Sequence, residues 1–91
     1  MLAYYDSHFG PVPVKITRVE RAGARWDIYC TVTANRPVWR SKSVKPTYPR
    51  GYKMLATERS VWPRDKVMLT ENGNIAATIN YNPEEAFAKF L

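Results

Sequence analysis

Basic and aromatic side chains are interleaved in the middle of this 91-residue chain. From Arg36 to Lys53 the sequence has six Lys or Arg residues and three aromatic rings, with no Asp or Glu. Cationic side chains neutralise phosphates with release of counterions, and aromatic rings offer a flat face to unstacked bases. The segment is therefore a candidate nucleic-acid-binding site, and its candidate residues are Arg36, Trp39, Arg40, Lys42, Lys45, Tyr48, Arg50, Tyr52 and Lys53.

The positive charge of the chain is concentrated in its middle third. The net charge is +6, from 14 Lys or Arg and eight Asp or Glu. From Arg36 to Lys66 there are nine basic and two acidic residues, and the rest of the chain has five basic and six acidic residues. This asymmetry favours an anionic partner. A second interpretation stays open, in which the aromatic rings cover one end of the fold and the basic residues only solvate a loop.

Few residues have side chains that act as nucleophiles, general bases or metal ligands. His8 is the only histidine, and Asp6 is the one carboxylate close to it in the sequence. Cys30 is the only cysteine, and its position among apolar residues favours a packed thiol over a nucleophile. The sequence has no phosphate-binding glycine loop, nucleophile elbow or zinc-protease motif. We expect no catalytic residue, no cofactor and no metal site.

The bulk composition predicts one small domain, residues 1–91, because a chain of this length has room for a single core. One cysteine allows no intramolecular disulfide, which fits a reducing compartment. The N-terminal residues show no export signal, and no apolar run is long enough to span a membrane. We expect a cytoplasmic protein with no membrane partner.

Alternating apolar residues predict extended strands in the first third. Val12, Val14 and Ile16 share one face of a strand, and the alternation shifts by one residue at Thr17-Arg18-Val19, which is typical of a β-bulge. Pro11 and Pro13 indicate an edge strand or a strand entrance. Residues 20–25 read as a hairpin connection. The stretch from Trp26 to Ala34 then alternates over nine residues, with Tyr29, Thr31 and Thr33 on its outward face.

The remaining elements are predicted by turn and capping residues. A long connection from Asn35 to Gly51 precedes an extended run, Tyr52 to Trp62, and we expect Arg64 and Asp65 to form a partly buried ion pair. A hairpin follows, with strands at 66–70 and 75–81 around an Asn72-Gly73 turn. A short C-terminal helix is capped by Asn82, with Pro83 in its first turn and Phe87, Phe90 and Leu91 on one side.

Together these elements predict an all-β domain. We expect a small five-stranded antiparallel sheet closed into a partly open barrel, SH3-like or alternatively OB-like, with a short C-terminal helix. The segments Gly10-Pro11-Val12-Pro13-Val14-Lys15-Ile16 and Val61-Trp62-Pro63-Arg64 resemble short SH3-like proteins encoded by tailed phages. That resemblance implies a fold and a viral origin, and no activity. For a viral protein, the expected location is the cytoplasm of the host cell.

Three functions are compatible with these features. The first is a non-enzymatic module that binds nucleic acid through the basic, aromatic segment. The second is a protein-interaction or assembly module, since small β-domains present edges and grooves to partners. The third is a small toxin-like ribonuclease, in which Arg and Lys stabilise the transition state and His8 is the one candidate base.

Overall fold

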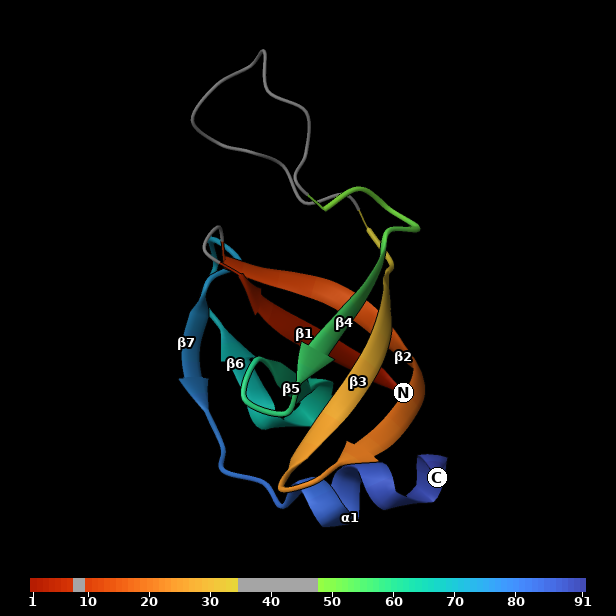
Figure 1. Cartoon of the computed structure of the whole chain (residues 1–91). Helices are drawn as coiled ribbons and strands as arrows, with labels where there is room; N and C mark the ends of the chain where they lie inside the picture. The colour runs from red at the N-terminus through yellow and green to blue at the C-terminus, as the bar shows by residue number, and fades with distance from the viewer. Residues whose placement is uncertain (8–9, 35–47) are drawn as a thin grey trace.

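The computed structural model describes residues 1–7, 10–34 and 48–91 of the chain. In these ranges the chain forms seven strands, one short α-helix and two 3-10 turns (Figure 1). Their bounds are β1 (Leu2–Ser7), β2 (Gly10–Ala22), β3 (Arg25–Val32), β4 (Lys53–Thr57), β5 (Val61–Pro63), η1 (Arg64–Lys66), β6 (Val67–Leu69), β7 (Ile75–Thr78), α1 (Pro83–Phe87) and η2 (Ala88–Phe90).

Five of the strands form one sheet, here called the main sheet, in the order β4-β3-β2-β1-β5. Every neighbouring pair is antiparallel. The all-β class, the five-stranded antiparallel sheet and the short C-terminal helix are thus confirmed. The sheet is not closed into a barrel, because β4 and β5 are its two edge strands and do not pair with each other. The SH3-like or OB-like assignment stays a prediction.

The main sheet bends because its two edges are joined by a short link. Only residues 58–60 connect β4 to β5. A flat sheet of five strands would place its edge strands about 19 Å apart, whereas four residue steps span at most about 14 Å. The sheet therefore curls until its edges approach each other, and Figure 1 shows the long strands β2 and β3 bending accordingly.

The β2–β3 hairpin follows the sequence closely. Gly23 in its turn has a φ of 63°, a conformation that favours glycine. The predicted bulge is confirmed between Ile16 and Arg18, where the register with β3 shifts by one residue. The bulge lets Val19 join Ile16 on the buried face although the two residues are three positions apart.

Pro11 and Pro13 were expected to mark either an edge strand or a strand entrance. The edge strand is wrong, because β2 pairs with β1 on one side and with β3 on the other. The strand entrance is confirmed, because β2 begins at Gly10. The prolines are tolerated because pairing with β3 begins only at Val14. The carbonyl of Pro13 accepts a hydrogen bond from the Thr33 amide on the β3 side (3.0 Å). Both prolines therefore lack an N–H that would point away from β1, so the β1–β2 ladder loses no donor.

Two further predictions are corrected in the main sheet. The strand β1 was not expected from the sequence, because Tyr4 and Tyr5 obscure its alternation. The run from Tyr52 to Trp62 is two strands rather than one: it breaks at residues 58–60, where the Ser60 amide donates to the Thr57 carbonyl (3.0 Å). The second strand, β5, then pairs with β1 at the opposite edge.

The strands β6 and β7 form a separate two-stranded sheet, here called the distal hairpin. Its existence confirms the predicted 66–70 and 75–81 pairing, although both strands are shorter than expected. Gly73 in the turn has a φ of 80°, as the Asn72-Gly73 pair predicts.

The hydrophobic core lies on the inner face of the main sheet. Its buried residues come from β1, β2, β3, β4, β5 and α1. They are Ala3, Val12, Val14, Ile16, Val19, Trp26, Ile28, Cys30, Val32, Ala56, Val61 and Phe87. No charged or polar side chain is fully buried among the described residues, so the fold depends on apolar burial rather than on an internal polar network.

The short helix α1 lies at one end of the main sheet, opposite the end at which residues 48–52 lie (Figure 1). Its predicted cap is confirmed, since Asn82 Oδ1 accepts a hydrogen bond from the Glu84 amide (2.9 Å). Phe87 is fully buried, with its ring centroid 6.3 Å from that of Trp26. Phe90 packs partly against the core, but Leu91 is exposed, so the predicted common face ends at Phe90.

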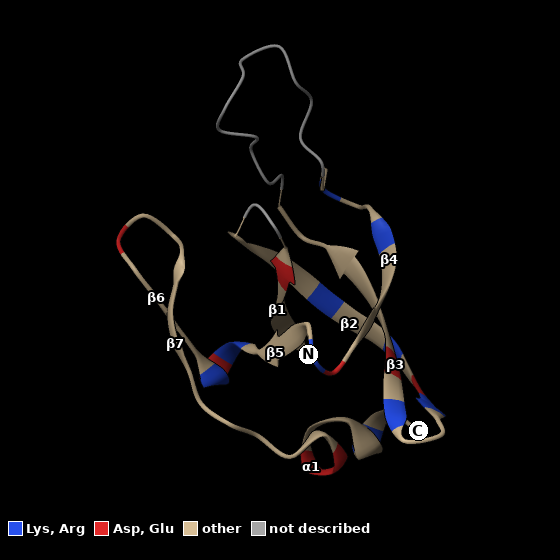
Figure 2. Cartoon of the chain, turned by 60° about the vertical axis from the view of Figure 1, so that its left-hand side comes forward, with Lys and Arg blue, Asp and Glu red and all other residues tan. Residues whose placement is uncertain are grey.

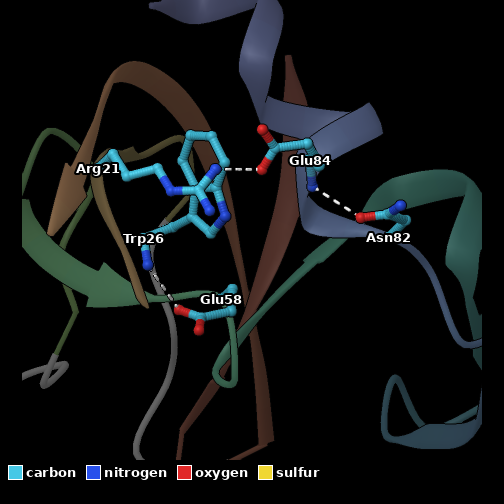
Figure 3. A network of polar contacts seen from close by, with 5 residues as sticks. All are labelled: Arg21, Trp26, Glu58, Asn82 and Glu84. Atoms are coloured by element: carbon cyan, nitrogen blue, oxygen red, sulfur yellow. Dashed lines mark hydrogen bonds and ion pairs between the residues drawn. The ribbon is translucent and has the colours of Figure 1, made fainter. Parts of the chain in front are cut away.

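Polar contacts hold α1 in place around the Trp26 ring (Figure 3). Arg21 lies over that ring, 4.9 Å from its centroid, and pairs with the Glu84 carboxylate of α1. The Trp26 amide donates to the Glu58 carboxylate (3.1 Å). Because Arg21 and Glu84 are half-exposed, their ion pair adds little free energy, and its main effect is to fix the orientation of α1.

Tyr81 links the distal hairpin to the main sheet. Its ring meets Phe87 edge-on, at a centroid distance of 5.8 Å. Its hydroxyl donates a shared hydrogen bond to two carbonyl oxygens, that of Val61 (2.6 Å) and that of Glu58 (3.1 Å). Burial, followed by the negative charge of Glu58, raises the pKa of Tyr81 well above 10.

Replacing Tyr81 by Phe removes this donor, and we expect the free energy of unfolding to fall by about 1–2 kcal/mol. Because the pKa of Tyr81 is raised in the folded state, its contribution to the free energy of unfolding is present below pH 10 and is lost as the pH rises above 10. Urea denaturation should therefore show a weaker alkaline loss of stability in Tyr81→Phe. Tyr4→Phe is the control, since the Tyr4 hydroxyl bonds to none of the described residues; equal effects of both variants would contradict the assignment.

Candidate nucleic-acid interface

Three tyrosine rings lie in a row over the end of the core opposite α1, and we call them the tyrosine row. The Tyr5 and Tyr48 centroids are 5.7 Å apart with the planes tilted by 60°. Tyr48 and Tyr52 are stacked, with centroids 6.1 Å apart and planes 21° from parallel. The row joins β1 to the residues that lead into β4, so it fixes the start of β4 against the rest of the sheet.

The rings of the tyrosine row differ in exposure. Tyr5 and Tyr48 pack against the buried core. Burial, together with the adjacent Tyr5, raises the pKa of the Tyr48 hydroxyl. Tyr52 is 42% exposed and has Tyr48 against one face. Tyr48 therefore serves the core, as the second sequence interpretation proposed, whereas Tyr52 presents a ring to solvent.

Basic side chains flank the tyrosine row on β4 and on the turn before it. Arg50 is exposed in that turn, where Gly51 has a φ of 89°. Lys53 is exposed on β4 and lies opposite Thr31 of β3, which lies opposite Lys15 of β2. This register places Lys15, Thr31 and Lys53 in one line across the outer face of the sheet.

Beside this line the outer face has a shallow hollow of about 470 Å³. Arg18 lies over the Tyr29 ring there, 5.1 Å from its centroid, and pairs with Glu20. Leu55 of β4 lies opposite Tyr29 and is 54% exposed. The hollow is lined by Thr17, Arg18, Tyr29, Cys30, Thr31, Lys53, Met54 and Leu55.

The structure describes the positions of four of the nine predicted site residues. Tyr48, Arg50, Tyr52 and Lys53 lie together at one end of the main sheet. The other five candidates, Arg36, Trp39, Arg40, Lys42 and Lys45, lie outside the described residues, as does most of the predicted connection from Asn35 to Gly51. The structure adds Tyr5 and Lys15 to the site. Tyr5 is not predictable from the sequence, because the adjacent Tyr4 and Tyr5 obscure the alternation of β1. The alternation around Lys15, together with the hairpin turn, could have placed Lys15 beside Thr31.

The basic residues that follow β4 do not join this site. Arg59 lies in the link between β4 and β5, and Arg64 and Lys66 lie on η1. Figure 2 shows basic positions spread over β2, β4, the β2–β3 hairpin and η1. The expected Arg64–Asp65 ion pair is absent from the described ranges, and both side chains are exposed because the 3-10 turn directs them into solvent. The charge excess from Arg36 to Lys66 is therefore not one patch in the described part of the chain.

Three basic residues of β2 and β3 are paired with carboxylates. Arg18 pairs with Glu20, and Arg21 pairs with Glu84. Arg25 Nε lies 3.6 Å from Asp27 Oδ1. Lys15 and Lys53 make no ion pair with any described residue, and the same holds for Arg59, Arg64, Lys66 and Lys89.

The thiol of Cys30 is buried on the inner face, as the sequence predicts. Burial raises its pKa from 9.0 to about 11. His8, the other candidate for chemistry, lies outside the described residues. Over residues 1–7, 10–34 and 48–91 there is no cluster of three His, Cys, Asp or Glu side chains able to hold a metal, and no helix long and apolar enough to cross a membrane.

Comparison with known proteins gives no relative: no family model, curated protein or solved structure matches this chain.

The raised pKa of Cys30 predicts slow modification of the folded protein by a thiol reagent. A change from 9.0 to about 11 lowers the thiolate fraction near neutral pH roughly 100-fold, and burial blocks access as well. Labelling followed by mass spectrometry should be at least about 100-fold slower in buffer than in denaturant. Equal rates in the two conditions would show that the Cys30 side of the sheet is open.

Proposed function

We propose that this chain is a non-enzymatic module that binds single-stranded nucleic acid at the tyrosine row and the basic residues beside it. The observation that supports this most directly is Tyr52: its ring is held parallel to Tyr48 and is 42% exposed, directly before Lys53. An exposed ring of fixed orientation stacks on an unpaired base, and a neighbouring ammonium binds the phosphate.

Preorganisation is what separates Tyr52 from an ordinary surface tyrosine. Tyr48 packs on the core and on Tyr5, so the surface against which Tyr52 stacks is itself fixed. A base that stacks on Tyr52 does not have to immobilise a free ring, which lowers the entropic cost of binding.

The arrangement of basic residues suggests a path for a bound nucleic-acid strand. Tyr52 directly precedes the edge strand β4, and Lys53 is the first residue of β4, in line with Thr31 and Lys15 on the outer face of the sheet. A nucleic acid that crosses this edge can stack a base on Tyr52 and place its phosphates at Lys53 and then at Lys15, along the line through Thr31. Single strands fit this path better than duplexes, because duplex bases are already stacked.

A binding role without catalysis is supported by the side chains themselves. The described residues of the site include no imidazole, carboxylate or thiol; they are Tyr5, Lys15, Tyr48, Arg50, Tyr52 and Lys53. The one thiol of the chain, Cys30, is protonated at neutral pH because its pKa is about 11.

Affinity for a short oligonucleotide should fall steeply with salt. If all six Lys and Arg residues from Arg36 to Lys53 contact phosphates, log affinity falls against log salt with a slope of about −4 for single-stranded nucleic acid. The double variant Arg50→Ala/Lys53→Ala should reduce that slope to about −3. The matched control, Arg59→Ala/Lys89→Ala, removes the same charge elsewhere and should leave the slope unchanged. A flat salt response in fluorescence anisotropy would reject the proposal.

Stacking on Tyr52 is tested by a second pair of variants. Tyr52→Ala removes the ring, and we expect a loss of roughly tenfold or more in affinity, since a base–aromatic stack is worth about 1–3 kcal/mol. Tyr52→Phe keeps the ring and should bind like the wild type. Isothermal titration at fixed low salt measures both, and equal affinities of Tyr52→Ala and Tyr52→Phe would exclude a stacking role.

A further inference from the structure

The distal hairpin is exposed in a way that the proposed function does not explain. Its two strands form a sheet of their own, and Figure 2 shows the hairpin projecting from the main sheet. Met68 is 61% exposed, and Ile79, directly after β7, is 51% exposed. An isolated two-stranded hairpin is only marginally stable in water, so additional contacts would stabilise this one.

The outer edge of β7 lacks the features that protect edge strands. Natural edges carry Lys, Pro or other charged residues that prevent pairing with another chain. The two edges of the main sheet have them: β4 begins with Lys53, and β5 ends with Pro63. The residues from Asn72 to Asn82 include no charged side chain and no proline.

The hydrogen bonds of the hairpin show which backbone groups this edge offers. The Ile79 amide donates to the Lys66 carbonyl (2.8 Å), and Thr78 lies opposite Val67. Because successive residues of an antiparallel strand bond to opposite sides, the N–H and C=O of Thr78 point away from β6. These groups are available to an added strand.

We propose that the outer edge of β7 pairs with the same edge of a second copy of this chain. The charge distribution favours a second copy as the partner. Two copies with a net charge of +6 repel each other, but from Val67 to Asn82 the only charge is that of Glu71. The distal hairpin is thus a described surface at which two copies approach with little repulsion. An acidic or basic partner would find no complementary charge there.

Two-fold symmetry makes the pairing self-consistent. Antiparallel pairing of β7 with its copy gives a four-stranded sheet and an interface in which the same patch occurs on both sides. Met68 lies opposite Ala77, and Ile79 shares their face by alternation. The symmetric sheet therefore gathers Met68 and Ile79 of both copies on one apolar face, while Ala76, Ala77 and Thr78 are small enough for close approach.

The oligomeric state of nucleic-acid-free protein tests this pairing. Light scattering coupled to size exclusion should give a mass near twice 10.5 kDa at high concentration, shifting to 10.5 kDa on dilution. Thr78→Pro removes an N–H that the β6–β7 ladder does not use, and should remain monomeric at concentrations at which the wild type is a dimer.

Charge variants keep the test independent of any effect of proline on folding. Ile79→Lys should be monomeric, whereas Leu55→Lys adds the same charge at an equally exposed apolar residue of β4 and should remain dimeric. Slow Cys30 labelling confirms that each variant is folded. A wild type that is monomeric at every concentration would overturn the proposal, as would a dimer that Leu55→Lys dissociates and Ile79→Lys does not. Nucleic-acid affinity is measured separately, so failure of one proposal leaves the other intact.

Discussion

Burial of the Phe87 ring against the inner face of the main sheet is the contact on which the rest of the structure depends. The sheet bends but does not close, so its apolar inner face would be open to water at the end occupied by α1. Phe87 is fully buried there against Trp26 and Tyr81. Complete burial of such a ring contributes about 2–3 kcal/mol, a large share of the stability of so small a domain.

The opposite end of the core must also be covered against water, and the tyrosine row covers it. Tyr48 covers apolar residues and at the same time supports the exposed ring of Tyr52. One feature therefore has two roles: the cover that an open sheet needs is also a rigid aromatic surface beside basic residues. The two interpretations of the sequence are compatible, because they apply to different rings of the same row.

The sequence predicted those parts of the fold that local patterns determine. The alternation that begins at Trp26, the bulge after Ile16, the Asn72-Gly73 turn and the Asn82 cap all follow from short-range chemistry. The alternation was predicted to continue to Ala34, whereas β3 ends at Val32 and Ala34 is exposed. The position of β5 does not, because its pairing with β1 depends on contacts between residues far apart in the chain. For the same reason the line from Lys15 through Thr31 to Lys53 required the register of three strands. Charge counted along the chain was misleading after Lys53, since Arg59, Arg64 and Lys66 leave the site as the backbone turns.

The most direct test of the proposed interface is residue-resolved NMR of the labelled protein during titration with a short single-stranded oligonucleotide. The account predicts that the largest chemical-shift changes occur at Tyr52, Lys53 and Lys15, with the resonances of α1 unchanged. Changes centred on η1 or on the distal hairpin, or no changes at low salt, would contradict it.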